Sequence, residues 1–161
     1  MSKAKATVRL TTGQAIDPRT IQAPPNVEAV QAAPHSKILP EASAVITHAG
    51  HGTVLKSLAA GVPLVCIPMG RDQNDNTVRV LRLGAGVRLK QQSTPRQIAA
   101  AVSEILYNPE YAAAARSYAQ VLTHEAASTP TATDEAEGLL RLNATYDSPQ
   151  NGSDDMGRLS G

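Results

Sequence analysis

The stretch "THAGHGT", residues 47–53, stands between an apolar run at 44–46 and the helix-like run "VLKSLAA" at 54–60. The apolar run predicts a strand, and the second run predicts the helix that follows it. In a parallel α/β sheet, ligands bind beyond the carboxyl ends of the strands, where the following helices present their N-termini. The stretch 47–53 occupies that position, so it marks both the predicted fold and the place to look for a site.

Further apolar runs alternate with helical patterns along the chain. The sequence predicts strands at 8–10, 27–30, 44–46, 63–67 and 86–89, and helices at 54–60, 73–83, 94–106 and 109–122. Strands that alternate with helices imply a parallel sheet with crossover helices, and runs that are apolar throughout fit strands covered on both faces. We therefore expect an α/β domain over residues 1–142, with a loop or broken helix at 13–26 and a disordered polar tail at 143–161.

Residue spacing also predicts which helical faces are buried. In the helix at 54–60, one face carries Val54, Leu55, Leu58 and Ala59. In the helix at 73–83, Val78 and Leu81 share a side. The run 94–97, "TPRQ", has the spacing of a capping box with proline at the first helical position.

Composition excludes several classes of function. The chain has 161 residues, 18% of them charged, and a net charge of +1, so there is no electrostatic case for binding nucleic acid or an anionic membrane. No run reaches membrane-spanning length and no secretory signal precedes residue 13, so we expect a cytoplasmic protein with at most peripheral membrane association. Cys66 lies in an apolar run and is expected to be a buried structural thiol.

The residues of 47–53 suit an anion. Gly50 and Gly52 let the backbone approach a ligand closely, and the free N–H groups of a helix's first turn favour negative charge. Thr53 is able to cap the helix or donate its hydroxyl to a phosphate, and His48 is able to donate a charge-assisted hydrogen bond to a diphosphate. The alternative is a tight turn with a threonine cap and two surface histidines, His48 and His51.

No metal site is expected. His48 and His51 would need further ligands, and His35 and His124 have no carboxylate at a supporting spacing.

A second polar cluster follows the next predicted strand, in "CIPMGRDQNDN", residues 66–76. A carboxylate beside an amide, as in Asp72 and Gln73, offers the acceptors and donors that sugar hydroxyls need. The alternative is helix capping by Asp72, with Asp75 in the first turn. Because two clusters on consecutive strand ends face the same crevice, one able to bind anions and the other hydroxyls, a sugar diphosphate would satisfy both.

Residues 34–89, above all "THAGHGT" and "GVPLVCIPMGRDQNDN", resemble the nucleotide-sugar-binding signature of family 1 glycosyltransferases, the UDP-glycosyltransferase superfamily. The resemblance is strongest to bacterial members that act on macrolides, lipids or other small molecules. It implies a Rossmann-like parallel sheet flanked by helices, one half of the GT-B fold, with the acceptor site and catalytic base in an N-terminal domain that this chain lacks. It also implies no cofactor other than the nucleotide-sugar substrate.

The resemblance assigns roles by position. It gives diphosphate binding to His48, Gly50, Gly52 and Thr53, binding of the sugar hydroxyls to Asp72 and Gln73, and loop support to Asn76. Nucleoside binding would fall to Ala32, His35 and Lys56, where other members carry a tryptophan, a glutamine and a glutamate. Lysine cannot accept a hydrogen bond from ribose and is able instead to pair with a phosphate or remain solvated. No aromatic residue precedes Tyr107, so the base contact stays open.

The leading hypothesis is the donor-binding half of an inverting, metal-independent glycosyltransferase that moves a hexose from a UDP- or dTDP-sugar to a hydroxyl of a small molecule or lipid. None of the four histidines matches the family's catalytic base, so the chain alone is expected to be inactive, and its inter-domain face is open to self-association. The alternative is a catalytically inactive remnant or a nucleotide-binding module. A sugar-nucleotide epimerase is a third reading.

Overall fold

The computed structural model describes residues 6–70 and 72–128. The predicted tail at 143–161 and the domain boundary at 142 lie outside these residues. The chain divides into two units, Met1–His124 and Glu125–Gly161, and the fold described below belongs to the first. Within the described residues, no helix combines the length and the hydropathy needed to cross a membrane.

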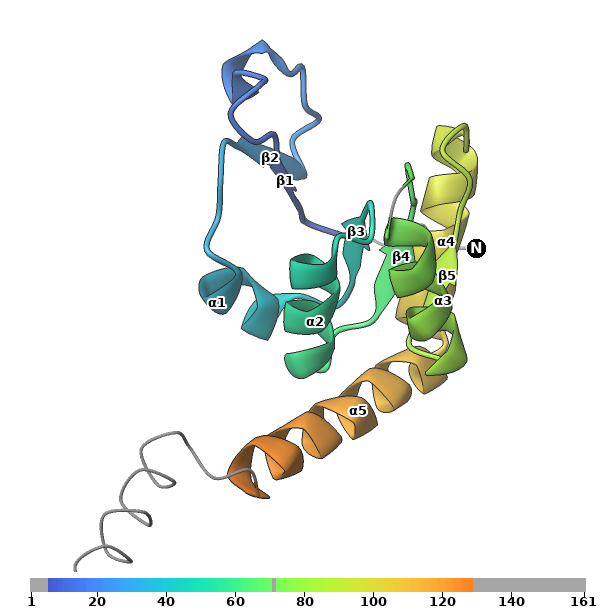
Figure 1. The fold of residues 1–161 in the computed structure, drawn as a ribbon. Coiled ribbons are helices and arrows are strands. Elements are labelled where there is room, and N and C mark those ends of the chain that lie inside the picture. Colours follow the sequence, from blue (N-terminus) through green and yellow to red (C-terminus); the bar gives the residue numbers. More distant parts are fainter. Residues whose placement is uncertain (1–5, 71, 129–161) are drawn as a thin grey trace, which may run out of the picture. The chain divides into compact units, whose positions relative to one another are not determined.

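The predicted strands and helices occur in the predicted order, and the structure adds one short α-helix that the sequence did not predict, α1 (His35–Ile38) (Figure 1). The strands are β1 (Val8–Thr11), β2 (Val27–Val30), β3 (Val45–Thr47), β4 (Leu64–Cys66) and β5 (Gly86–Arg88). The α-helices are α1 (His35–Ile38), α2 (His51–Ala59), α3 (Gln73–Arg82), α4 (Pro95–Tyr107) and α5 (Pro109–Ser128). Short 3-10 helices, η1 (Pro18–Thr20) and η2 (Leu39–Glu41), lie in the connections, so the segment 13–26 is a loop with one short helical turn.

The five strands of the described residues pair in parallel, as predicted, but they form two sheets in place of the single sheet expected. One has the order β3-β4-β5, and the other is the pair β1-β2. In the first, Leu64 of β4 lies opposite Val45 of β3 on one side and Gly86 of β5 on the other. The carboxyl ends of β3 and β4 therefore lie at the same edge of the sheet.

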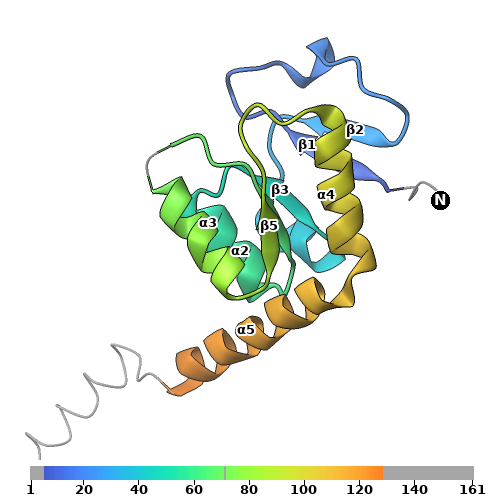
Figure 2. The same ribbon diagram turned by 90° about the vertical axis from the view of Figure 1, so that its right-hand side faces the viewer.

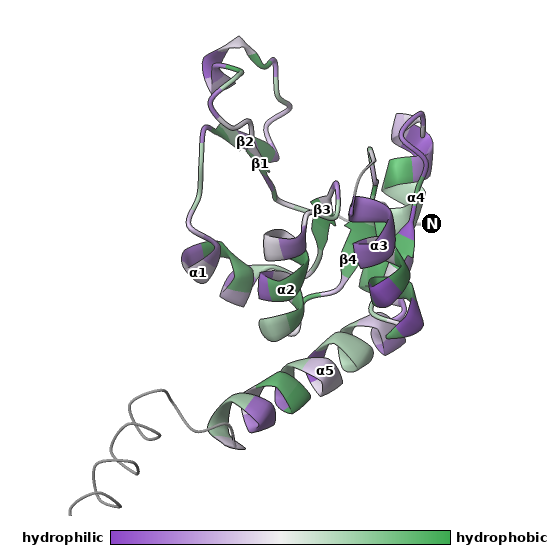
Figure 3. Cartoon of the chain, viewed as in Figure 1, coloured by the Kyte–Doolittle hydropathy of each residue, from purple (hydrophilic) through white to green (hydrophobic). Residues whose placement is uncertain are grey.

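Helices cover both faces of the β3-β4-β5 sheet. Helices α2 and α3 lie on one face and α4 lies on the other (Figure 2). Leu64 and Cys66 pack in a cluster with residues of α2 and α3, whereas Val65 packs against Ala101 and Ile105 of α4. Strand β4 is hydrophobic along its length (Figure 3) and fully buried, which confirms the predicted double covering.

Cys66 is a structural thiol, as the sequence predicts. Its side chain is fully buried, and burial raises the pKa of the thiol to about 11. The thiol therefore stays protonated at neutral pH and is a poor nucleophile.

Strand β1 contradicts the expectation of covering on both faces. All four of its residues are exposed, with Val8 at 37% and Leu10 at 40%. The connection from β1 to β2 contains only η1 and no α-helix, so it supplies no layer like those that bury β4.

The predicted buried faces of two helices are partly wrong. In α2, Val54, Ser57 and Leu58 are buried, whereas Leu55 and Ala59 are exposed. In α3 the buried residues are Asn76, Thr77 and Val80, and the expected pair, Val78 and Leu81, is 38% and 40% exposed. Thr77 tolerates burial because its hydroxyl donates to the Gln73 carbonyl, 2.7 Å away. In α3, polar residues with internal partners thus replace the expected apolar ones, whereas the buried hydroxyl of Ser57 in α2 has no hydrogen-bond partner among the described residues.

The capping box at the start of α4 is confirmed. The Thr94 hydroxyl accepts a hydrogen bond from the Gln97 N–H, and the Gln97 side chain accepts one from the Thr94 N–H at 2.8 Å.

Candidate functional site

The structure brings the two predicted clusters together at the carboxyl edge of β3 and β4. The side-chain amide of Asn76 joins them directly. Its Nδ2 lies 3.1 Å from the carbonyl oxygen of Ala49, in the segment after β3, and 3.2 Å from Oδ2 of Asp72, in the segment after β4. The anion-binding and hydroxyl-binding candidates therefore belong to one site.

Helix α2 begins without a side-chain cap. Gly50 is its N-cap, and Gly50 has no side chain to satisfy the first N–H groups. The expectation that Thr53 caps the helix is wrong, because Thr53 is the third helical residue and lies inside the first turn, with His51 and Gly52. The first-turn N–H groups have no partner within the helix, so they are available to an anion.

At Gly50, the backbone lies close to the imidazole of His48. The φ of −62° is open to any residue, and a Cβ at this position would lie 2.8 Å from Nε2 of His48, the far end of an exposed side chain that is able to shift and make room. The imidazole of His48, whose side chain is exposed, therefore lies beside the backbone at the start of α2. An imidazole at this place is able to donate to an anion held by the helix terminus.

Gly52 faces open space. A Cβ there would meet no atom within 4 Å, and the residue is exposed. Glycine inside a helix costs about 1 kcal/mol relative to alanine, so fold stability does not favour it. A bare backbone beside open space at a helix terminus leaves room for a ligand to reach the N–H groups.

Sequence reasoning missed Ala49 and Thr47. Among the described residues, Ala49 is the only non-glycine residue with a positive φ, 66°, and it is fully buried. Its N–H donates to the hydroxyl of Thr47, 3.2 Å away. The sequence carries no distinct signal for this conformation, because alanine is ordinary in both strands and helices.

At the start of α3, the capping alternative for Asp72 is contradicted. Asp72 occupies the N-cap position, but its side chain makes no capping hydrogen bond and instead accepts from Asn76. Asp75 lies in the first turn, as that alternative expects. Gln73 uses its Oε1 to accept from the Met69 N–H at 2.7 Å, which closes the loop before the helix. The carboxylate of Asp72 is exposed and the amide NH₂ of Gln73 remains, so the pair offers acceptors and a donor to hydroxyl groups.

The structure does not join the expected nucleoside-binding residues to this site. Ala32 is exposed after β2, His35 is half-buried at the start of α1, and Lys56 is exposed on α2. In the part of the chain that the structure describes, none of the three has a side-chain hydrogen bond to the segment that follows β3 or to the segment that follows β4. Nor do three or more His, Cys, Asp or Glu residues cluster as metal ligands within residues 6–70 and 72–128.

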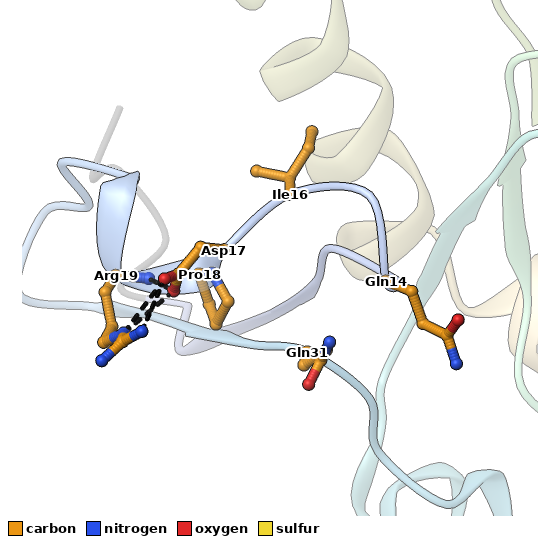
Figure 4. A pocket seen from close by; sticks show the side chains of 6 residues that line it. All are labelled: Gln14, Ile16, Asp17, Pro18, Arg19 and Gln31. Atoms are coloured by element: carbon orange, nitrogen blue, oxygen red, sulfur yellow. Dashed lines mark hydrogen bonds and ion pairs between the residues drawn. The ribbon is translucent and has the colours of Figure 1, made fainter.

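A hollow of about 420 Å³ is lined by residues that belong to neither of the two predicted clusters (Figure 4). It follows the ends of β1 and β2 and is lined by Gln14, Ile16, Asp17, Pro18, Arg19 and Gln31. The Arg19 guanidinium pairs with Asp17 at 2.8 Å and holds the pKa of that carboxyl below its usual value. Because Asp17 and Arg19 satisfy each other and are largely exposed, this hollow has little free charge to offer a ligand.

Comparison with known proteins agrees with this geometry. Residues 3–142 match the family described as "Erythromycin biosynthesis protein CIII-like, C-terminal domain". The NDP-glycosyltransferase YjiC of Bacillus subtilis (strain 168) is 30% identical over 139 residues, which cover 85% of this chain and 35% of that protein. The 4'-demethylrebeccamycin synthase of Lentzea aerocolonigenes is 37% identical over 89 residues, 55% of this chain and 21% of that protein. The chain therefore spans only a fifth to a third of the length of these relatives.

Solved structures show the same fold. CalG4, the calicheamicin glycosyltransferase, superposes with a TM-score of 0.71 at 29% identity, over 88% of this chain and 37% of that one. Glycosyltransferase VinC, solved in complex with dTDP, superposes with a TM-score of 0.67 at 22% identity, over 90% of this chain and 43% of that one. The chain belongs to the family of EryCIII-like C-terminal domains and has the fold of the C-terminal half of GT-B glycosyltransferases.

Proposed function

We propose that this chain is the nucleotide-sugar donor-binding domain of a glycosyltransferase. The whole enzyme would move a hexose from a UDP- or dTDP-sugar to a hydroxyl group of a small molecule or lipid, with inversion and without a metal ion. The observation that carries the proposal is the meeting of an open helix terminus with a carboxylate–amide pair at one sheet edge, held together by Asn76. A donor that is anionic at one end and rich in hydroxyls at the other matches this arrangement.

The diphosphate would lie at the start of α2. There the first-turn N–H groups have no side-chain cap, a Cβ at Gly52 would meet no atom within 4 Å, and the hydroxyl of Thr53 and the imidazole of His48 are side-chain donors. When the bond between the sugar and the diphosphate breaks, negative charge grows on the leaving phosphate. Fixed donors stabilise that charge without having to reorganise, which is the domain's contribution to catalysis.

The hexose would lie against Asp72 and Gln73. The exposed carboxylate accepts hydrogen bonds from sugar hydroxyls, and the Gln73 NH₂ group donates one. Gln73 has little freedom to move, because its oxygen is held by the Met69 N–H. Ala32, His35 and Lys56 would border the nucleoside, with Lys56 offering positive charge and no acceptor for ribose.

The remaining parts of the reaction are assigned elsewhere. The relatives are roughly three to five times longer than the segment they share with this chain. We assign acceptor binding and removal of the acceptor's proton to the part of the enzyme that these residues do not cover. The 161-residue chain should then bind nucleotide and transfer no sugar at a measurable rate.

Calorimetric titration of the 161-residue chain with UDP and dTDP tests the proposal. Loss of the His48 side chain should weaken diphosphate binding by about ten- to a hundredfold, because a hydrogen bond to a charged group contributes about 1.5–3 kcal/mol. His51→Ala is the matched control, since its imidazole is also exposed at the same helix start and has no assigned role; its effect should stay within about twofold.

Two outcomes would contradict the proposal. Failure of the wild-type chain to bind either nucleotide favours a remnant without donor binding. Equal losses in His48→Ala and His51→Ala would show that His48 has no specific role.

A nucleotide-binding module without transferase activity is the second candidate, favoured by the exposed Lys56 and Ala32 in place of nucleoside-reading side chains. Such a module would bind UDP and UDP-glucose equally well. A donor-binding domain should bind the sugar nucleotide more tightly, through Asp72 and Gln73.

A further inference from the structure

Two buried side chains hold Ala49 in a left-handed conformation. Its φ is 66° and it is fully buried. Its N–H donates to the Thr47 hydroxyl at 3.2 Å, and its carbonyl accepts from Asn76 Nδ2 at 3.1 Å. Residues other than glycine adopt this conformation only where their surroundings impose it. Thr47 and Asn76 therefore fix the direction in which the chain enters Gly50 and the first turn of α2.

The same nitrogen of Asn76 also orients the sugar-binding loop. Nδ2 carries two hydrogens, and its second partner is Oδ2 of Asp72, 3.2 Å away. That bond leaves Oδ1 of the exposed Asp72 for a ligand. Asn76 itself is only 4% exposed, so it bonds to the loop after β3 and to the loop after β4 from a buried position. Ala49 and Asn76 are 27 residues apart in the sequence, which makes this a tertiary link and not a local turn.

We propose that Asn76 is a positioning residue that couples recognition of the diphosphate to recognition of the sugar. The proposal rests on the proposed function and adds a property to it. Because one buried amide nitrogen holds the loop on each side, neither loop keeps its geometry when the amide is removed. Ordering of the diphosphate loop then increases the contribution that the sugar makes to affinity.

The test is calorimetric titration of the 161-residue chain with UDP and UDP-glucose, and with dTDP and dTDP-glucose. The wild-type chain is compared with Asn76→Ala, Asp72→Ala and the double variant. Asn74→Ala is the matched control, because Asn74 is an exposed asparagine on the same helix whose side chain accepts from Arg88 instead. Thermal unfolding checks that each variant is folded.

Coupling has a specific signature. Asn76→Ala should weaken nucleoside diphosphate binding about tenfold and bring the affinities for diphosphate and sugar nucleotide close to each other. Asp72→Ala should lower sugar-nucleotide affinity in the wild-type background and have little effect in the Asn76→Ala background. Asn74→Ala should change neither affinity. The proposal is overturned if Asn76→Ala leaves the ratio of the two affinities unchanged, or if Asp72→Ala keeps its full effect in the double variant.

Adding Ala49→Gly to Asn76→Ala separates the two hydrogen bonds. Glycine adopts a φ of 66° freely, so this change should restore the affinity for the diphosphate. The contribution of the sugar to affinity should stay low, because the Asp72 carboxylate still lacks its hydrogen bond from Asn76. Restoration of both affinities, or of neither, would contradict separate action on the two loops.

Amide hydrogen exchange of the unliganded chain provides a readout that needs no nucleotide. Exchange in peptides covering 47–53 should be faster in Asn76→Ala than in Asn74→Ala. If the wild-type chain binds no nucleotide, the proposed function fails while this measurement still tests the link. Unchanged exchange at 47–53 would overturn the link whatever the binding result.

Discussion

Strands β1 and β4 are both short and pair in parallel with a neighbour, but they lie in contrasting surroundings. Every residue of β4 is fully buried between α2 and α3 on one face and α4 on the other, whereas every residue of β1 is exposed. The connections differ, because those around β4 contain packed helices and the one after β1 contains only η1. The residues differ too, since β4 (LVC) is apolar throughout and β1 (VRLT) carries Arg9 and Thr11. Covering helices and the strand's own residues together decide how much a strand contributes to stability.

The largest difference should come from adding one methyl group at a glycine in each region. A Cβ at Gly86 in β5 would clash with the Leu64 carbonyl oxygen, so Gly86→Ala forces the backbone of the two strands apart and should destabilise the fold by more than about 4 kcal/mol. At Gly13, after β1, a Cβ meets no atom within 4 Å, and Gly13→Ala should cost only the left-handed strain of its φ of 69°, about 1 kcal/mol. Urea unfolding measures both, and similar losses would contradict the contrast.

Truncating one leucine in each region gives the next largest difference. Leu64 is fully buried in β4, so Leu64→Ala should cost about 2–5 kcal/mol from lost burial and the cavity left behind. Leu10 in β1 is already 40% exposed, and Leu10→Ala should cost about 1 kcal/mol or less. A loss at Leu10 as large as that at Leu64 would mean that β1 is covered in solution.

Burial of Cys66 in β4 should make stability depend on alkaline pH. The pKa of the folded thiol is about 11, against 9.0 for an exposed one, so the unfolded chain loses this proton first as the pH rises. Below pH 9 both states are protonated and there is no effect. Between about pH 9 and pH 11 the thiol lowers the free energy of unfolding by up to about 2 kcal/mol. Comparing the free energy of unfolding in urea of wild type and Cys66→Ala across this pH range isolates the contribution of the thiol. If the free energies of the two proteins change with pH in parallel, the burial of the thiol is contradicted.

The smallest effect should be a gain in stability from a substitution in the first turn of α2, the helix that follows β3. Gly52→Ala adds a Cβ into open space inside α2 and should stabilise the unliganded chain by about 0.5–1 kcal/mol. The same methyl group narrows the approach to the first-turn N–H groups, so affinity for UDP should fall. For this one variant, thermal unfolding should therefore show a higher stability, while calorimetry should show a lower affinity for UDP. A variant that is more stable and binds UDP unchanged would show that no ligand lies over Gly52.

The sequence predicts the site's location well and its internal bonding poorly. The parallel order of β3 and β4 follows from local periodicity, and it requires that the segments that follow these two strands begin at one edge of the sheet. Capping by Thr53 or Asp72 was wrong, because a polar residue near a predicted helix start has several competing partners in the folded chain. Asp72 bonds Asn76 instead, and Gly50 supplies the cap position of α2. The left-handed Ala49 gave no distinct signal, since alanine is ordinary in both strands and helices.

The sequence by itself determined the order of the strands and of every α-helix except the short α1, the burial of Cys66, the capping box at Thr94 and the two strand ends that carry the candidate site. These features depend on residues that are neighbours along the chain. Only the tertiary structure decided that Thr77 and Val80 face the core in place of Val78 and Leu81, that β1 stays exposed, and that Asn76 reaches Ala49. Each of these depends on which element packs opposite, and that partner lies far away in the sequence.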